Sequence, residues 1–234
     1  MSLSNVRTLL VDLDGTLLGS RSKLSRKFIY HSIQYFRKQG LSTLKSLIAL
    51  HKLRVAIEIH QPGVLNADRA AQALAEFLNI PTEHGRKLAR EMAEDVFSNL
   101  EDCFFPIPGA QKFIDWARPK YKLILATNAV WTRDIVELRM RWGGIDPAHF
   151  QFIVNNGELC SCKPSVTYYS ELVEKLKLNP QECLMIGDSE KKDLPAKEVG
   201  IPVFLLTSGD SLREREPQVW FGNWAALQML LERI

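Results

Sequence analysis

The chain has 234 residues and a formal net charge of +3, with 46% hydrophobic and 24% charged residues. This composition excludes an intrinsically disordered chain and is typical of a folded protein with a hydrophobic core. The sequence contains neither a run of about 18 apolar residues nor a secretion signal, so we expect a cytoplasmic protein that does not enter a membrane.

Short apolar runs, each bounded by Asn, Gly, Pro, Asp or Ser, predict the strands of a parallel sheet. These runs cover residues 6–13, 121–126, 150–154, 183–186 and 203–206. Helices are expected between and after them, near residues 109–117, 131–142, 165–176, 190–198 and 223–233. Strands that alternate with helices predict an α/β fold, with a Rossmann-like parallel sheet core and helices on both faces.

Residues 20–100 interrupt this alternation. Apolar residues recur there at helical spacing, as in Ile29, Ile33 and Phe36, and no short strand-like run appears. We therefore expect a helical cap domain inserted into an α/β catalytic core. The expected boundaries are residues 20–100 for the cap, and residues 1–19 with 101–234 for the core.

The first half of the expected cap is basic. Residues 21–60 hold nine Lys or Arg and one acidic residue, Glu58. This excess fits two interpretations, a solvated helical face or a surface that attracts an anionic substrate.

The first predicted strand ends in Asp12-Leu13-Asp14-Gly15-Thr16, at the position where open α/β sheets bind ligands. Side chains two residues apart on a strand point to the same face, so Asp12 and Asp14 converge. Two neighbouring carboxylates repel each other unless a cation offsets them, and a hard cation such as Mg²⁺ prefers oxygen ligands. A plain polar turn at the end of a strand is the alternative interpretation.

Three further polar motifs follow other predicted strands. Thr127 and Asn128 offer a hydroxyl group and backbone N–H groups to phosphate oxygens, and Lys163 supplies a cation. Asp188 and Asp193 add carboxylates for a metal ion. Each motif alone is more simply explained as a helix cap or a solvated side chain. Their combination favours one phosphate-binding site.

In this order the motifs resemble those of the haloacid dehalogenase superfamily of hydrolases, over residues of about 5–19 and 101–207. Residues 105–109 also resemble the return from a helical cap inserted after the first motif, as in phosphoglycolate-phosphatase-like members. The resemblance implies a Mg²⁺-dependent phosphatase that hydrolyses a small phosphate monoester through an aspartyl-phosphate intermediate.

The resemblance also implies a role for each motif residue. Asp12 is implied as nucleophile and metal ligand, Asp14 as general acid/base and metal ligand through its backbone carbonyl, and Asp188 as metal ligand. Thr127, Asn128 and Lys163 are implied to bind phosphate, with Asp193 in a supporting role.

The same residues bear on several alternative functions. The second acidic residue, Asp14, disfavours a dehalogenase, whereas a phosphomutase or a catalytically silent binding module of the same fold stays open. No dinucleotide-binding glycine motif follows the first strand, so no nucleotide cofactor is implied, and nucleic acid is not an expected partner. The expected partner is a small phosphorylated metabolite.

The positions of the cysteines lead to two expectations. Their spacing is not that of a zinc site, so we expect four reduced thiols, Cys103, Cys160, Cys162 and Cys183. Relatives often have Gly three residues before the lysine, where this chain has Cys160, so the loop that presents Lys163 is expected to differ.

Overall fold

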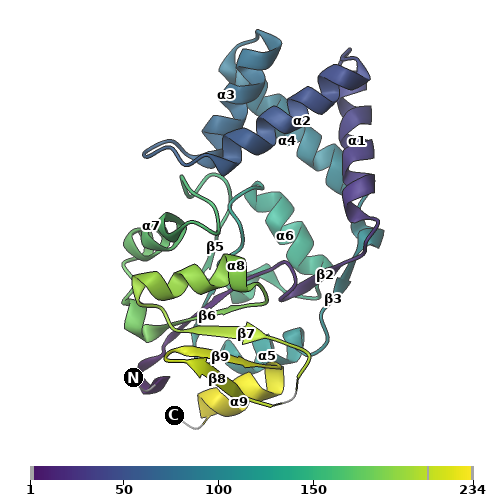
Figure 1. Ribbon diagram of the computed structural model, residues 1–234. Coiled ribbons are helices and arrows are strands. Elements are labelled where there is room, and N and C mark those ends of the chain that lie inside the picture. Colours follow the sequence, from purple (N-terminus) through teal and green to yellow (C-terminus); the bar gives the residue numbers. More distant parts are fainter. Residues whose placement is uncertain (1–2, 210, 233–234) are drawn as a thin grey trace.

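The computed structural model describes residues 3–209 and 211–232 and contains a seven-stranded sheet at its centre. The strand order is β5-β4-β1-β6-β7-β9-β8, and all neighbouring strands are parallel except the antiparallel pair β8 and β9. The strands are β1 (Thr8–Val11), β4 (Lys122–Leu125), β5 (Phe152–Ile153), β6 (Cys183–Gly187), β7 (Val203–Leu206), β8 (Arg213–Glu216) and β9 (Val219–Gly222). The predicted α/β fold with a parallel sheet core is confirmed (Figure 1).

Helices cover both faces of the sheet because successive strand residues point to opposite sides. Leu9 and Val11 pack in one core cluster with residues of α5 (Ala110–Ala117), α6 (Arg133–Trp142) and α9 (Trp224–Glu232). Leu10 packs in a second cluster with residues of α7 (Val166–Leu176) and the 3₁₀ segment η5 (Leu194–Val199). The remaining 3₁₀ segments are η1 (Leu3–Asn5), η2 (Glu101–Cys103), η3 (Pro147–His149) and η4 (Pro180–Glu182).

Two sequence expectations need correction in this core. The helix expected at 190–198 is divided into α8 (Glu190–Asp193) and η5, because Pro195 has no N–H for a helical hydrogen bond. Strands β8 and β9 were both missed. The sequence of β8, Arg-Glu-Arg-Glu, is exposed throughout and lacks an apolar run, whereas β9, Val-Trp-Phe-Gly, is apolar but only four residues long. The last expected helix extends to residue 233, which lies outside the described residues.

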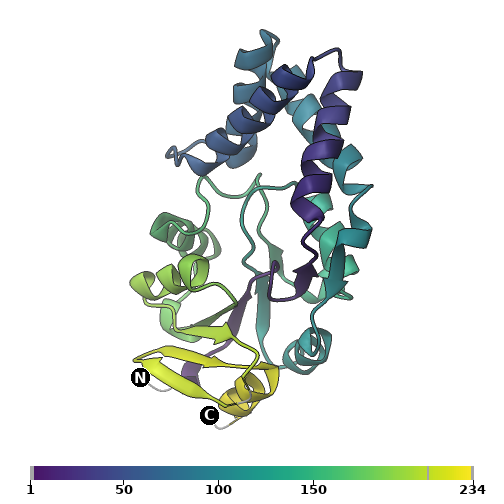
Figure 2. The same ribbon diagram turned by 45° about the vertical axis from the view of Figure 1, so that its right-hand side comes forward.

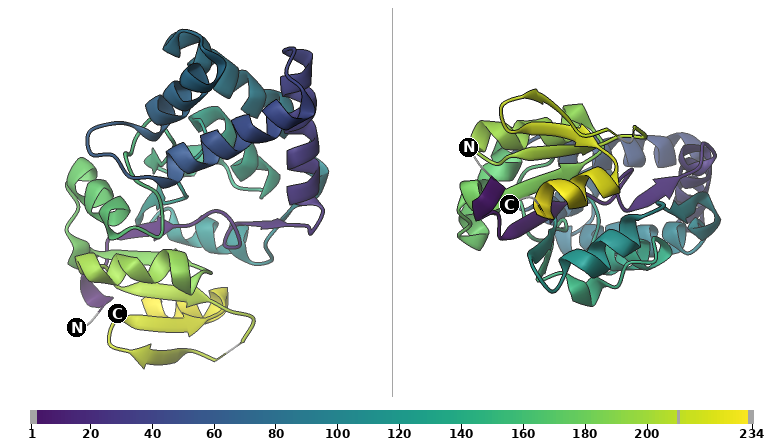
Figure 3. Two further views of the ribbon diagram at one scale, coloured as in Figure 1. Left: turned by 45° about the horizontal axis from the view of Figure 1, so that its top comes forward. Right: turned by 90° about the horizontal axis from the view of Figure 1, so that it is seen from below.

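Residues 24–97 form a helical unit of four helices, α1 (Leu24–Lys38), α2 (Thr43–Glu58), α3 (Asn66–Leu78) and α4 (Thr82–Phe97). An antiparallel pair of short strands, β2 (Leu18–Ser20) and β3 (Phe104–Pro106), joins this helical unit to the sheet. Figures 1 and 2 show the unit above the sheet, and the left view of Figure 3 shows the same separation from another direction.

The buried face of α1 differs from the expected apolar stripe. Ile29 is 46% exposed, whereas Ser32, Tyr35 and Phe36 are buried. Ser32 tolerates burial because its hydroxyl group donates to the Phe28 carbonyl at 2.8 Å. The stripe was predicted from hydrophobicity alone; the buried face lies about one residue away from it and includes Ser32, whose hydroxyl group is satisfied by this bond.

Part of the basic excess in residues 21–60 is neutralised at the surface. Its ion pairs join Lys23 and Lys27 to Asp102, Lys38 to Asp95, and Arg54 to Glu58. These pairs are largely exposed, which supports the interpretation of a solvated helical face.

Since β1, β4, β5 and β6 are parallel, their carboxyl ends meet at one edge of the sheet. That edge faces the helical unit (Figure 1). Within the described residues, no helix has both the length and the apolar character needed to cross a membrane.

Candidate active site

Lys163 lies at the centre of the site, and its side chain is fully excluded from solvent. The ammonium group donates to Asp12 Oδ1 at 2.9 Å and to Asp193 Oδ1 at 2.7 Å. The ring centroids of Tyr168 and Tyr169, in α7, lie 5.8 and 5.9 Å from Nζ. A buried ammonium group is tolerated only when it is paired. The two carboxylates therefore fix the position of the cation.

Asp193 is fully buried at the end of α8. Its Oδ1 accepts from Lys163, and its Oδ2 accepts from the backbone N–H of Ser189 at 3.1 Å. A side chain at Gly187 would collide with the Asp193 carboxyl group, so the last residue of β6 has to be glycine. The predicted supporting residue thus lies in direct contact with the predicted phosphate-binding lysine.

Asp188 follows β6 and lies against the turn that follows Asp12. Thr16 Oγ1 donates to Asp188 Oδ1 at 3.5 Å, and a Cβ at Gly15, whose φ is +84°, would collide with the Asp188 carboxyl group. Carboxylate oxygens of Asp12, Asp188 and Asp193 lie within 4.8 Å of one another. We call these three residues the acidic cluster. Three carboxylates are a donor set that suits Mg²⁺, so the cluster fits a divalent cation.

The acidic cluster carries more negative charge than its lysine offsets. The pKa of Asp12 is raised to about 7, mainly by burial and also by the charges of Asp193 and Asp14, against the opposing effect of Lys163. Burial lowers the pKa of Lys163, but Asp12 and Asp193 outweigh it, so this pKa lies above its usual value. Partial burial, followed by Asp193, raises the pKa of Asp188. The site therefore favours additional positive charge.

Thr127 and Asn128 follow β4 at the same edge of the sheet. Thr127 is buried, and its carbonyl accepts a hydrogen bond from Tyr168 Oη at 2.7 Å. Asn128 Oδ1 accepts from the backbone N–H of Lys163 at 3.1 Å. Asn128 thereby connects the loop after β4 with the loop that carries Lys163.

Asp14 lies apart from the acidic cluster. Its side chain is 44% exposed and forms an ion pair with Arg139, a buried residue of α6. The Arg139 guanidinium carbon lies 5.7 Å from the ring centroid of Phe97 and 5.6 Å from that of Phe104. Arg139 was not among the predicted site residues. Its signal was its position three residues after Val136, on the buried face of the predicted helix.

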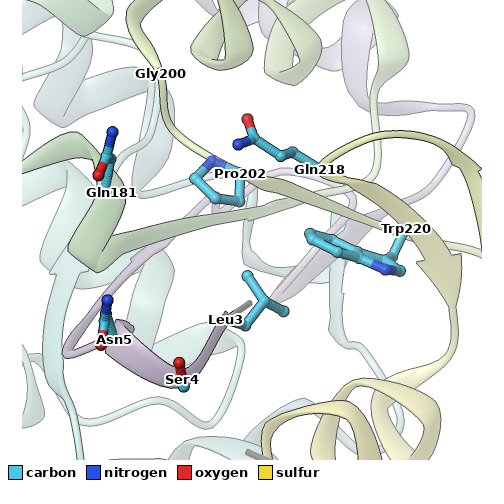
Figure 4. Close-up of a pocket in the computed structure, with 8 residues that line it drawn as sticks. All are labelled: Leu3, Ser4, Asn5, Gln181, Gly200, Pro202, Gln218 and Trp220. Atoms are coloured by element: carbon cyan, nitrogen blue, oxygen red, sulfur yellow. The ribbon is translucent and has the colours of Figure 1, made fainter. Parts of the chain in front are cut away.

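A cavity of about 120 Å³ lies at the opposite edge of the sheet (Figure 4). Most of its lining residues precede strands rather than follow them, as Leu3 precedes β1 and Pro202 precedes β7, while Trp220 lies in β9. This cavity is therefore separate from the chemistry of the acidic cluster.

The sequence profile of the haloacid dehalogenase-like hydrolases matches residues 6–200. The chain belongs to this family. It is 25% identical over 228 residues to a phosphoglycolate phosphatase of Mesorhizobium japonicum, covering 95% of this chain and 94% of that protein. It is 22% identical over 200 residues to the pyrophosphatase PpaX of Bacillus mycoides, covering 83% of this chain and 80% of that protein.

A crystal structure of a haloacid dehalogenase phosphatase from Thermococcus onnurineus has the same fold. Its TM-score is 0.61 at 18% identity, over 97% of this chain and 98% of that one. The predicted family resemblance is confirmed, and the protein is a hydrolase.

The excess negative charge of the site predicts that the stability of the folded protein depends on pH. The raised pKa of Asp12 means that the folded protein holds this proton more tightly than the unfolded chain, whose Asp pKa is about 3.8. The folded state therefore loses stability as pH rises from about 4 to about 7. Asp12→Asn cannot ionise, so in EDTA it should raise Tm at pH 8 by several degrees, since ~1 kcal/mol shifts Tm by about 2–4 °C at this size.

The measurement is thermal unfolding of both proteins in EDTA at pH 4 and pH 8. Asp102→Asn is the control of opposite sign, because Lys23 and Lys27 hold the pKa of Asp102 below its usual value. A Tm difference between wild type and Asp12→Asn that is the same at both pH values contradicts the assignment of the buried charge to Asp12.

Proposed function

We propose that this hydrolase is a Mg²⁺-dependent phosphatase that acts on a small phosphate monoester through an aspartyl-phosphate on Asp12. The contact between Asp12 Oδ1 and Lys163 Nζ, 2.9 Å long and next to Asp188 and Asp193, supports this proposal most directly. A carboxylate can attack phosphorus only where nearby positive charge offsets the charge of the phosphate oxygens. Lys163 lies where it would supply part of that charge.

Each predicted residue then has a chemical task. Asp12 Oδ attacks phosphorus and the ester oxygen leaves, so the phosphoryl group is transferred to Asp12. Asp14 protonates the leaving oxygen and later takes a proton from the water that hydrolyses the aspartyl-phosphate. Lys163 and the Thr127 hydroxyl group hold the phosphate oxygens in both steps. Asp193 keeps Lys163 in position through the 2.7 Å contact.

Mg²⁺ would bind beside the acidic cluster, at Asp12 and Asp188. The cluster's three carboxylates and one lysine leave a net negative charge, which is consistent with the raised pKa values of Asp12 and Asp188. When bound, Mg²⁺ offsets charge on the phosphate oxygens and orients the ester for in-line attack. We propose Asp12, the backbone carbonyl of Asp14, and Asp188 as its ligands.

We further propose that residues 20–100 act as a cap over a catalytic core of residues 1–19 and 101–234. The helical unit lies above the carboxyl edge of the sheet, where it would enclose the substrate (Figure 1). The names of the two relatives, a phosphoglycolate phosphatase and a pyrophosphatase, support a small anionic phosphate compound as substrate.

The central experiment measures hydrolysis of p-nitrophenyl phosphate and of a panel of phosphorylated metabolites, with Mg²⁺ and with EDTA. Wild type should turn over in Mg²⁺ and lose activity in EDTA, and Asp12→Asn should be inactive while remaining folded. Lys112→Ala, an exposed change in α5, is the matched control and should keep wild-type activity. Full activity in EDTA, or in Asp12→Asn, contradicts the proposal.

Asp188→Ala should raise the Mg²⁺ concentration needed for half-maximal activity by about tenfold or more, since a carboxylate ligand is removed. Glu190→Ala is the control, because Glu190 is acidic and lies two residues away but pairs with Arg215 at 3.0 Å. A Mg²⁺ titration of the three proteins makes the comparison. Equal half-saturation in wild type and Asp188→Ala would remove Asp188 from the ligand set.

Asp14→Asn should slow the hydrolysis of phenyl phosphate by roughly 10²–10⁴-fold. The effect on p-nitrophenyl phosphate should be much smaller, because nitrophenolate leaves without a proton. The test compares kcat/KM of the two esters in both proteins. The same loss on both esters would show that Asp14 does not protonate the leaving group.

A further inference from the structure

The side chain of Asn66, the first residue of α3, is fully buried between the helical unit and the sheet domain. Its Nδ2 donates to the carbonyl of Ala129 at 2.9 Å and to the carbonyl of Ser161 at 3.1 Å. Ala129 lies two residues after Thr127, and Ser161 lies two residues before Lys163. One amide group of the helical unit thus joins the two loops assigned to phosphate.

The backbone of α3 reinforces this contact. The first N–H groups of a helix have no partner within the helix and need one from outside. Here no side chain caps α3, and instead Asn66 N donates to the Leu159 carbonyl at 3.1 Å and Ala67 N to the Asn156 carbonyl at 2.8 Å. The loop between β5 and α7 therefore caps the helix, and the helix in turn fixes this loop.

Arg69 holds the Asn66 amide in its orientation. Arg69 is buried and donates to the Asn66 side-chain oxygen, which leaves the Asn66 nitrogen directed at the two loops. Arg69 also donates to the Cys160 carbonyl at 2.6 Å, and His60 Nδ1 lies 3.1 Å from the same oxygen. Cys160, which replaces the expected glycine, has no positive φ and presents its carbonyl to the helical unit.

We propose that Asn66 is a positioning residue that sets the spacing between the Thr127 loop and the Lys163 loop. The inference rests on the proposed phosphatase function, because it assigns phosphate binding to those loops. Within the sheet domain the loops are joined by the contact from the Lys163 N–H to Asn128 Oδ1. Asn66 adds a second connection from the helical unit, so the spacing between the loops depends on the helical unit lying against the sheet domain.

Asn66→Asp tests this proposal with almost no change of shape. A carboxylate cannot donate, so its oxygens would face the Ala129 and Ser161 carbonyl oxygens, while the contact with Arg69 is kept. We expect kcat/KM for p-nitrophenyl phosphate to fall between ten- and about 10²-fold, since small displacements of substrate-positioning groups have effects of this size. Asn66→Ala removes the same donors without adding charge and provides the comparison if Asn66→Asp does not fold.

Two further measurements distinguish a loss of positioning in these loops from a general loss of structure in the site. The inhibition constant of inorganic phosphate should rise about tenfold or more, whereas the Mg²⁺ half-saturation should stay within about twofold, because Asn66 does not contact the segment that carries Asp188. Gln72→Ala is the matched control on α3, since Gln72 is exposed and bonds to Glu76 at 2.8 Å. Folded Asn66 variants with wild-type kcat/KM and phosphate inhibition would overturn the proposal, as would equal changes in phosphate and Mg²⁺ affinity.

If the phosphatase proposal is wrong, wild type itself hydrolyses no phosphate ester, and this result distinguishes its failure from failure of the positioning proposal. Hydrogen exchange then decides the positioning role independently of activity. Peptides that cover residues 128–131 and 160–163 should exchange faster in Asn66→Asp than in wild type, while Gln72→Ala should match wild type. Unchanged exchange in both loops overturns the inference.

Discussion

The structure of the site depends on one buried contact, the ammonium group of Lys163 held between Asp12 and Asp193. Removing an ammonium group and two carboxylates from water costs several kcal/mol per ion, and their mutual attraction offsets this cost only when the geometry is good. Neighbouring residues meet that requirement. Gly187 leaves room for the Asp193 carboxyl group, the Ser189 N–H occupies its second oxygen, and Asn128 fixes the Lys163 backbone.

Even with Lys163 in place the site keeps an excess of negative charge. This excess bears on the order in which a cation and a phosphate group bind. The acidic cluster brings three carboxylates together around one lysine, and burial raises the pKa of Asp12 to about 7. A phosphate ester is itself an anion, so its approach to this cluster is unfavourable without further positive charge. Under the proposed function, a divalent cation therefore has to occupy the cluster before, or together with, the phosphate group.

The parallel sheet and the residues at its edge followed from sequence, because parallel strands bring their carboxyl ends together whatever the loops contain. That rule placed Asp12, Thr127 and Asp188, whereas Lys163 lies in a loop well after β5 and was assigned with the help of the family resemblance. Arg139 and Asn66 were not predicted, because each acts through partners far away in the chain: Asp14 for Arg139, and Ala129 and Ser161 for Asn66. A buried polar residue on a helix gives only a weak local signal, since hydrophobic periodicity treats it as an interruption.

Both unpredicted residues connect the helical unit with the site, and they do so at different places. Asn66 reaches the two loops assigned to phosphate from the start of α3. Arg139 contacts Asp14 and packs between Phe97 at the end of α4 and Phe104 in β3, where the chain returns to the sheet. A movement of the helical unit would therefore disturb the loops proposed to bind phosphate through Asn66, and the proposed acid/base through Phe97, Phe104 and Arg139. In this arrangement the groups proposed to bind phosphate and the proposed proton donor, Asp14, adopt their observed positions together, when the helical unit lies against the sheet.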